Sequence, residues 1–374
     1  MGNVSVGYQD GCLAPFFVST MSISKAREMG IETIWVPDHF MGFAPKWMWK
    51  PEICAAANVI HSGDALYDPI AVLAYAAAAF PGMTLGTSVT DPIRRHPMSL
   101  AQSFVTLDHM TEGRAILGIG NGLVENTEPY GFPSKMRVSR LEEALEVLTL
   151  LFASGGAPTS YEGKYYQLDG AIFDLPLHDG RAPRIFIGAH APRMLDLTGR
   201  FASGWLPGQV IDGDEYGRRL AAIARGAEKA GRSMDGFLAC QTLLLVLGDS
   251  RDEVMEQALA SPYVAYNALG LPGFMWKQFG LSHPYGDDWF GTLDMVPSKT
   301  TPEDVDAAAS QITAELLEQQ YYFGTPHDVA EAARPLVDAG CGHFIFANMG
   351  GNFTGRGLAD FDSMAELAGL LQAM

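Results

Sequence analysis

The residues best suited to chemistry stand where short apolar runs give way to polar side chains. The run Thr33–Val36 is apolar and β-rich, and Asp38 and His39 follow it closely. A histidine just beyond a buried strand is well placed as a general acid or base, because its pKa is easily brought near neutral. Asp38 could orient that histidine or bind a cofactor. A lone histidine can also cap or pack, and the sequence leaves both interpretations open.

A second group of candidates follows the apolar residues that begin at position 83. Thr87, Ser88 and Thr90 are small and polar at the expected strand end, and residues 94–96 read Arg-Arg-His. Such a basic cluster is uncommon in this acidic chain. It predicts either an anionic ligand group or a solvated turn paired with nearby carboxylates.

A glycine-rich stretch at residues 113–131 reads GRAILGIGNGLVENTEPYG. Its apolar run Ala115–Ile119 lies between turn residues, which is typical of a buried parallel strand. Glycines at the carboxyl end of that strand let the backbone approach a flat ligand closely. A Rossmann fingerprint needs G-x-G-x-x-G opening into a helix. Here the spacing is G-x-G-x-G, and Pro129 blocks an immediate helix.

A further candidate for ligand binding lies in residues 184–200. The strand expected at Arg184–Gly188 leads into Ala189, His190 and Ala191, and a helix is expected to start at Pro192. Exposed N–H groups at a helix N-terminus form an anion site. The P-loop, HExxH, GxSxG and EF-hand patterns are all missing from the sequence, which argues against kinases, zinc proteases, serine hydrolases and calcium binders.

The elements that must position these residues repeat one local pattern. An amphipathic stretch ends at a glycine, and a short β-rich run follows, which is typical of the connection from a helix to a strand. The amphipathic stretches are 22–29, 104–110, 218–230 and 329–339. The expected strands are 4–7, 33–36, 83–90, 115–119, 184–188, 205–207, 237–247 and 343–347. This alternation predicts a (β/α)8 TIM barrel, formed by residues 1–374 as a single domain, over an open doubly wound sheet.

Long irregular segments interrupt the pattern at 40–68, 122–138, 154–183 and roughly 261–301. Those that follow strands are expected at the C-terminal mouth of the barrel, where barrel active sites lie. The first and last are rich in aromatic residues: Phe40, Phe43, Trp47, Trp49, Tyr263, Tyr266, Phe274, Trp276, Phe279, Tyr285, Trp289 and Phe290. These side chains either pack the insertions onto the barrel or line a large apolar substrate pocket.

Composition excludes several classes of protein. Hydrophobic residues make up 48% of the 374 residues and charged residues 18%, as in a globular enzyme. The net charge of -18 argues against nucleic acid and anionic membranes as partners. No apolar run reaches membrane-spanning length, and no secretory signal opens the chain. The four cysteines show no CxxC or CxxH spacing, so we expect no zinc site and a cytoplasmic location.

Taken together, these stretches resemble the bacterial luciferase-like family of flavin and deazaflavin (coenzyme F420) barrel enzymes. Within it, the chain is most similar to the coenzyme F420-dependent phthiodiolone ketoreductase-like group. The resemblance covers nearly the whole length. It is carried by WVPDHF (35–40), LGTSVTDPIRRHP (85–97), GRAILGIGNG (113–122), NTEPYG (126–131), FDLP (173–176) and AHAPRMLDLTGRFASGWLP (189–207).

The resemblance implies a deazaflavin ring lying across the barrel mouth. His39 would be the catalytic acid or base beside the ring's reactive carbon. Ser88 and Val89 match a strand-three bulge, often a cis non-proline peptide, that supports the ring. Residues 188–191 match the loop whose backbone holds the cofactor phosphate. The full set implied to bind the cofactor is Asp38, Ser88, Val89, Thr90, Asn121, Gly122, Glu128, Gly188, Ala189, His190 and Ala191.

Two departures from the family pattern bear on the substrate. Leu123 stands where related F420-dependent enzymes carry a glutamate with an acid role. Acid–base chemistry then falls on His39 alone or on a shifted Glu125. The tryptophan that sugar-phosphate dehydrogenases carry after the Asp-His pair is also missing from residues 41–43. We therefore expect hydride transfer between reduced deazaflavin and a ketone or alcohol on a bulky apolar substrate, not on a sugar phosphate.

Two other functions remain open from the sequence. The same barrel supports flavin monooxygenases that use FMN and oxygen, and the strand-end residues fit both ring systems. A non-catalytic cofactor-binding protein is the third possibility, which Leu123 keeps open. The resemblance also implies a homodimer formed through barrel-side helices. The segments Pro69–Phe80 and His96–Met110 are apolar on more than one side, as a second contact surface would require.

Overall fold

The computed structural model describes residues 4–208 and 212–374, and a parallel sheet organises them. The sheet order is β10-β9-β11-β1-β2-β3-β4-β7-β8, and β8 also pairs with β9, so every strand except β10 belongs to a closed ring. The strands are β1 (Ser5–Gln9), β2 (Thr33–Val36), β3 (Thr84–Thr87), β4 (Ala115–Ile119), β7 (Arg184–Ile187), β8 (Gly204–Trp205), β9 (Leu238–Leu247), β10 (Tyr322–Gly324) and β11 (His343–Asn348). The predicted (β/α)8 barrel is confirmed.

Most predicted strands are present with small shifts at their ends. Thr33–Val36 and Ala115–Ile119 have the predicted bounds. The prediction for residues 83–90 was too long, because the strand ends at Thr87 and Thr90 forms only an isolated bridge to Ile119. The run predicted at 205–207 is the two-residue strand Gly204–Trp205.

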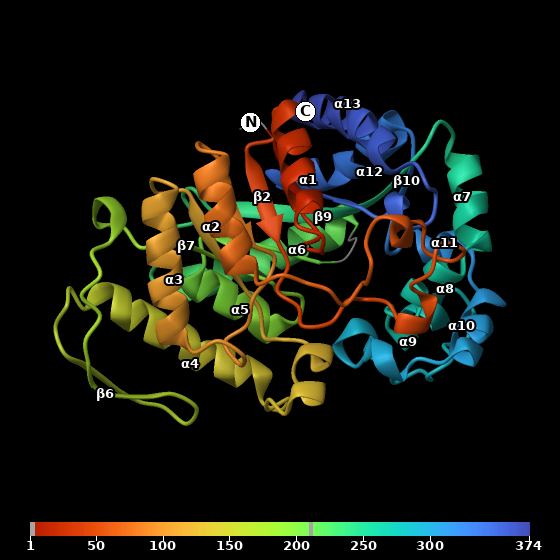
Figure 1. Ribbon diagram of the computed structural model, residues 1–374. Coiled ribbons are helices and arrows are strands. Elements are labelled where there is room, and N and C mark those ends of the chain that lie inside the picture. The colour runs from red at the N-terminus through yellow and green to blue at the C-terminus, as the bar shows by residue number, and fades with distance from the viewer. Residues whose placement is uncertain (1–3, 209–211) are drawn as a thin grey trace.

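Helices surround the barrel (Figure 1), and the two chain ends lie close together beside α1 and α13. The outer helices are α1 (Phe17–Glu28), α2 (Pro69–Ala79), α3 (Pro97–Met110), α4 (Arg137–Ala153), α5 (Pro192–Phe201), α6 (Gly213–Lys229), α12 (Pro326–Asp338) and α13 (Asp360–Gln372). The glycines predicted to follow helices all have positive φ: Gly30, Gly113, Gly231 and Gly340. An L side chain would be strained there, so glycine ends these helices without cost.

The interior of the barrel is filled by side chains, so the ring of strands is a packed core. The buried residues of this inner cluster are Trp35, Ile116, Phe186, Leu206, Cys240 and Ile345. Trp35 donates its indole N–H to Nε2 of His343 at 3.1 Å. A Cβ added at Gly7 would lie 2.7 Å from both partners, so only glycine fits between them. Ligands must therefore bind at the mouth and not inside the ring.

The insertions differ from the prediction in one respect. Residues 261–301 were expected to be too irregular for helices, but they contain α8 (Pro262–Ala268) and α9 (Gly273–Gln278). These helices are too short to show a helical period in the sequence. The flanking helices are α7 (Arg251–Ala260), α10 (Pro302–Ala309) and α11 (Ala314–Leu317). Together with residues from the 40–68 segment, they form a second hydrophobic cluster on one side of the barrel (Figure 1).

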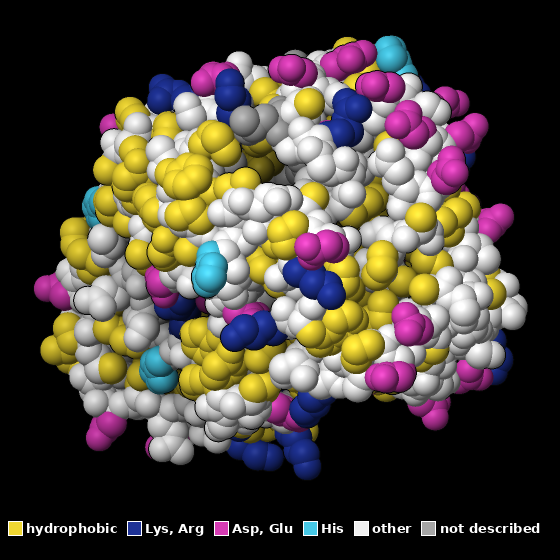
Figure 2. Space-filling view, turned by 45° about the vertical axis from the view of Figure 1, so that its right-hand side comes forward, with side chains coloured by type: hydrophobic (Ala, Val, Ile, Leu, Met, Phe, Trp, Pro, Cys, Tyr) yellow, Lys and Arg dark blue, Asp and Glu magenta, His cyan; other side chains and the backbone are white. Residues whose placement is uncertain are grey.

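The other two insertions are largely non-helical. Residues 154–183 contain the antiparallel hairpin β5 (Thr159–Glu162) and β6 (Gln167–Ala171), which extends from the barrel beyond α4 (Figure 1). Segment 122–138 contains the short 3-10 turns Val124–Asn126 and Glu128–Tyr130 before α4 begins at Arg137. Hydrophobic side chains remain on the surface in several clusters (Figure 2). Within the described residues, no helix is long and apolar enough to cross a membrane.

Candidate active site

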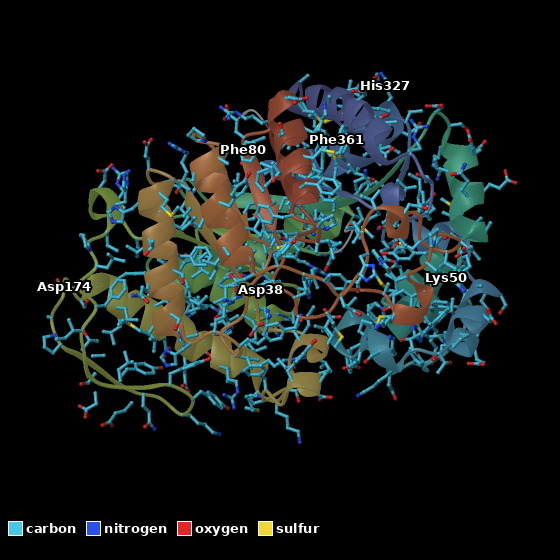
Figure 3. All side chains as sticks on the ribbon, in the orientation of Figure 1. Asp38, Lys50, Phe80, Asp174, His327 and Phe361 are labelled. Carbon is cyan, nitrogen blue, oxygen red and sulfur yellow. The ribbon has the colours of Figure 1, made fainter. Side chains whose placement is uncertain are left out.

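The candidate site lies at the mouth of the barrel, where the carboxyl ends of β2, β3, β4 and β7 meet. Because all strands of the ring run parallel, residues that follow them lie at the same end. This geometry brings the Asp-His pair next to the segments that follow β3 and β4. Asp38 lies deep within the fold, away from Lys50 in the first insertion (Figure 3).

His39 is held by two side chains from the loop after β4. Its Nδ1 lies 2.9 Å from Oε1 of Glu125, and the two side chains are 8% and 3% exposed. Nδ2 of Asn126 lies 2.7 Å from the same nitrogen. The orientation of the Asn126 amide follows from its other contact, because its Oδ1 accepts from the backbone N–H of Phe40 at 2.8 Å. The ring of Phe43 packs edge-on against the imidazole at 4.3 Å.

These contacts allow His39 to exist in two states. When Nδ1 carries a proton it donates to Glu125, and when Nδ1 is bare it accepts from Asn126. In the described parts of the chain, the hydrogen bonds of the imidazole involve Nδ1 alone, so Nε2 is left for a ligand. A carboxylate on Nδ1 stabilises the imidazolium, which is the arrangement that acid–base catalysis requires.

Asp38 does not orient His39, although the sequence had allowed that role. Its carboxylate accepts from Thr90 Oγ1 at 2.6 Å, from Arg95 Nε at 2.8 Å and from Arg94 Nη1 at 3.1 Å. Burial alone would raise the pKa of Asp38, but the hydrogen bond from Arg95 and the positive charges of both arginines outweigh it and lower the pKa. Asp38 therefore fixes the end of β2, and with it the backbone that carries His39.

The basic cluster after β3 pairs with carboxylates, the second of the two possibilities left by the sequence. Arg94 is almost fully buried and also contacts Asp91 at 2.5 Å, while Arg95 contacts Asp68 at 2.6 Å. Both guanidinium groups are therefore used to hold Asp38. Neither is free to bind an anionic ligand as the structure stands.

The segment after β3 forms a floor at the centre of the mouth. The peptide between Ser88 and Val89 is cis, as the resemblance implies. Val89 packs on the inner cluster of the barrel. A Cβ added at Gly120 would lie 2.9 Å from Val89, and one at Gly188 would lie 3.5 Å from it. Glycines thus let the ends of β4 and β7 close around Val89.

The residues predicted to bind the cofactor after β4 lie in different environments. Gly122 has a φ of 79° and sits against Asp91 and Ile93, so the turn there requires glycine. Asn121 is partly exposed beside it. Glu128 is exposed on the second 3-10 turn and does not reach His39. Glu125 supplies the carboxylate next to His39 instead, which is the shifted position that the sequence had left open.

The loop after β7 leads into a helix whose first turn has no side-chain cap. Ala191 is the N-cap residue of α5, and Pro192 is its first residue. Nε2 of His190 accepts from the Gly208 N–H at 3.1 Å, and its Nδ1 lies 3.0 Å from the Arg219 guanidinium. Burial, reinforced by the charge of Arg219, lowers the pKa of His190 to about 4, so this histidine is neutral. The backbone N–H groups of α5 are the part of the loop suited to an anion.

The sequence interpretation missed Asn126 as a partner of His39. Its only signal was its place next to Glu125, since an asparagine in a turn usually bonds to its own backbone. Within residues 4–208 and 212–374, no three His, Cys, Asp or Glu side chains are arranged to hold a metal ion.

Comparison with known proteins places these features in context. Residues 22–343 match the luciferase-like monooxygenase family. The phthiodiolone/phenolphthiodiolone dimycocerosates ketoreductase of Mycobacterium tuberculosis is 36% identical over 354 residues, 93% of each chain. An F420-dependent glucose-6-phosphate dehydrogenase of Nocardia farcinica is 28% identical over 330 residues, 86% of this chain and 84% of the relative. The fold is shared with an F420-dependent secondary alcohol dehydrogenase in complex with an F420–acetone adduct, at a TM-score of 0.75, 19% identity and 99% coverage of both chains.

Proposed function

The chain belongs to the luciferase-like monooxygenase family, and we propose that it is a coenzyme F420-dependent oxidoreductase acting on a ketone–alcohol pair of a bulky apolar substrate. The observation that carries this proposal is the buried contact between His39 and Glu125 at the barrel mouth. The ketoreductase and the two dehydrogenases described above support the choice of reaction and cofactor. The enzyme is proposed to be cytoplasmic, in keeping with its four unpaired thiols.

The residues present fit a deazaflavin. Val89, enclosed by Gly120 and Gly188, would support the flat ring, and the first turn of α5 would receive the phosphate of the side chain. Ser88, Thr90, Asn121 and Gly122 lie next to Val89 or Gly120 in the chain, and they are proposed to contribute contacts to the ring. When bound, the cofactor supplies the hydride for ketone reduction or accepts it in alcohol oxidation.

His39 would donate or accept the proton that accompanies hydride transfer. In ketone reduction, the imidazolium donates its Nε2 proton to the oxygen that gains negative charge, while Nδ1 keeps its proton on Glu125. In alcohol oxidation, Nε2 takes the hydroxyl proton, and Glu125 stabilises the resulting cation. Asn126 Nδ2 lies 2.7 Å from Nδ1 of His39 and helps to hold the ring in place. Phe43 packs edge-on against the imidazole on one side of the pair.

The substrate is proposed to be apolar, and three arginines that follow β3 and β7 are paired with carboxylates. Arg94 and Arg95 are paired with Asp38, and Arg193 is paired with Glu142 at 2.6 Å. Phosphate is best held by bidentate arginine contacts, which these side chains cannot offer without breaking their own ion pairs. Burial of apolar substrate surface against apolar side chains of the insertions would instead contribute about 25 cal/mol of binding free energy per Å².

A direct test is titration of the purified protein with F420 and with FMN, followed by fluorescence. Binding of F420 together with turnover of a ketone or secondary alcohol supports the proposal. The family also contains monooxygenases, so FMN binding without F420 binding would replace it with an FMN-dependent monooxygenase. Binding of F420 without turnover of a broad ketone and alcohol panel would favour the non-catalytic cofactor-binding alternative.

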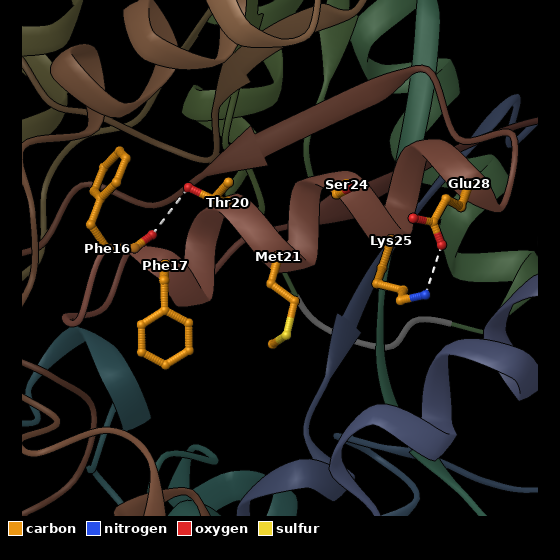
Figure 4. Close-up of a pocket in the computed structure, with 7 residues that line it drawn as sticks. All are labelled: Phe16, Phe17, Thr20, Met21, Ser24, Lys25 and Glu28. Carbon is orange, nitrogen blue, oxygen red and sulfur yellow. Dashed lines mark hydrogen bonds and ion pairs between the residues drawn. The ribbon is translucent and has the colours of Figure 1, made fainter.

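We also propose that the protein is a homodimer formed through the α1–α3 side of the barrel. Residues 69–90 contain no charged side chain, in a chain with a net charge of -18. Tyr75 on α2 is 38% exposed and packs edge-on against Phe16. Phe17 and Met21 point from α1 into a neighbouring groove of about 650 Å³ (Figure 4). The uncharged α2 segment and the apolar side chains of this groove, which Lys25 and Glu28 also line, are suited to contact a second copy of the chain. A monomer mass by light scattering at micromolar concentration would exclude the dimer.

A further inference from the structure

His190, in the loop between β7 and α5, lies between two groups that only donate hydrogen bonds. Its Nε2 lies 3.1 Å from the backbone nitrogen of Gly208, and its Nδ1 lies 3.0 Å from Nη1 of Arg219 on α6. A backbone N–H and a guanidinium group have protons to donate and no lone pair to offer. A neutral imidazole has one N–H and one lone pair, so it can accept a hydrogen bond from one of these neighbours and not from both.

This mismatch is present in either tautomer of His190. If Nε2 accepts from Gly208, the proton is on Nδ1 and faces the N–H of Arg219. If Nδ1 accepts from Arg219, the proton is on Nε2 and faces the N–H of Gly208. An imidazolium would face donors on both sides, in keeping with the pKa of about 4 that burial and the charge of Arg219 give this histidine. One donor is therefore left without an acceptor among residues 4–208 and 212–374.

The mismatch lies at the mouth of the barrel. His190 follows the end of β7 and Gly208 follows the end of β8, and both strands end at the mouth. Gly188, two residues before His190, lies beside Val89, where a planar ring is proposed to bind. The first turn of α5 starts at Pro192, two residues after His190. A ligand on Val89 is thus within a short chain's reach of His190.

The contacts of Arg219 leave its Nη1 facing His190 and no carboxylate. Its Nε donates to Glu215 at 2.8 Å, and the same carboxylate also binds Arg218 at 2.7 Å. One carboxylate therefore serves two guanidinium groups. The side chain of Arg219 is 23% exposed, so its charge can be reached by a bound anion.

We propose that Nδ1–H of His190 and Nη1–H of Arg219 together bind an oxyanion of the cofactor's side chain. This inference rests on the proposed function, because it takes the cofactor to be F420, whose side chain carries a phosphate followed by glutamyl carboxylates. Donor atoms 3.0 Å apart can share one oxygen acceptor, and Nε2 then accepts from Gly208, so each of these groups has a partner. These side chains add a positive charge to the backbone N–H groups of α5.

The test is the affinity of Arg219→Gln for F420, with Arg218→Gln as the matched control. Arg218 binds the same carboxylate, but its side chain is 66% exposed and its contact is with Glu215. We expect the Kd for F420 to rise roughly 10–10²-fold in Arg219→Gln, the loss typical of one charge-assisted hydrogen bond. Arg218→Gln should keep the wild-type Kd. Arg219→Lys retains the charge and should recover part of the affinity.

Shortened cofactors identify the anion. The deazaflavin ring with its ribityl chain alone has neither phosphate nor carboxylates, so its Kd should be the same for the wild type and Arg219→Gln. A form with the phosphate but no glutamates separates the two sources: it loses affinity in Arg219→Gln if the phosphate is bound, and keeps it if the glutamyl carboxylates are bound.

Two results would overturn this inference and leave the proposed function standing. One is a wild-type Kd for F420 in Arg219→Gln, and the other is an equal loss of affinity for the ring with its ribityl chain alone, which a purely structural role of Arg219 would produce. Wild-type protein that binds neither F420 nor this ring would instead overturn the proposed function, and the role of Arg219 with it.

Discussion

Replacement of Asp38 by asparagine tests the claim that this carboxylate fixes the strand end that carries His39. Asp38 is 2% exposed and accepts hydrogen bonds from Thr90, Arg94 and Arg95. Asparagine keeps one acceptor but presents an NH2 group to donors and removes the negative charge. The arginines would then be left without the charge that they surround.

The size of the effect follows from the geometry of the ion pairs. Removing one partner of a buried pair costs about 3–5 kcal/mol. The lower end applies here, because Arg94 keeps Asp91 and Arg95 keeps Asp68. With an unfolding entropy of about 2.1 cal/mol/K per residue, a loss of about 3 kcal/mol lowers the Tm of a 374-residue chain by about 4 °C. Because the His39 backbone would shift, kcat should fall as well.

Calorimetry or circular dichroism of Asp38→Asn measures the shift, and Asp68→Asn is the control. The Asp68 side chain is 49% exposed and serves only Arg95 and the first turn of α2, so its replacement should cost less than about 1 kcal/mol. If Asp38→Asn melts within 1 °C of the wild type, the assignment of Asp38 as the group that holds this strand end is refuted.

The stability difference should also depend on pH with a definite sign. The folded-state pKa of Asp38 is lowered, so the unfolded chain, with an ordinary carboxyl pKa of about 3.9, takes up a proton first as pH falls. The stabilisation from Asp38 is complete well above that value and disappears as pH falls through the folded-state pKa. The Tm difference between wild type and Asp38→Asn should therefore be largest near neutrality and narrow on acidification. A difference that grows in acid would contradict the reasoning.

The remaining predictions concern activity. His39→Ala should lower turnover by roughly 10²–10⁴-fold with F420 affinity nearly intact, and unchanged turnover would remove His39 from the mechanism. Glu125→Gln should lower kcat/KM by about 10–10²-fold, since a charge-assisted hydrogen bond is worth about 1.5–3 kcal/mol; exposed Glu112→Gln, distant from the mouth, is the control. Across 2-alkanones of rising chain length, kcat/KM should increase. Better turnover of a sugar phosphate than of these ketones would contradict the apolar-substrate proposal.

Much of the fold was predictable because its signals are local. Apolar runs such as Thr33–Val36 and Ala115–Ile119 mark buried parallel strands, and a glycine such as Gly113 marks the end of the helix before one. The regular alternation of these signals is what predicts the barrel. The short helices α8 and α9 escaped prediction, because one or two turns carry no measurable period.

The candidate site was likewise predictable only where its signals are local in the sequence. The sequence by itself determined that Asp38 and His39 follow a strand and that a basic cluster follows β3. Only the tertiary structure decided which carboxylate contacts His39 and which one pairs with the arginines. Asp38, adjacent in sequence to His39, is taken by Arg94 and Arg95, while Glu125, 86 positions away in the chain, reaches His39. Side chains of neighbouring residues on extended backbone point in opposite directions, whereas closure of the barrel brings the ends of β2 and β4 to the same mouth.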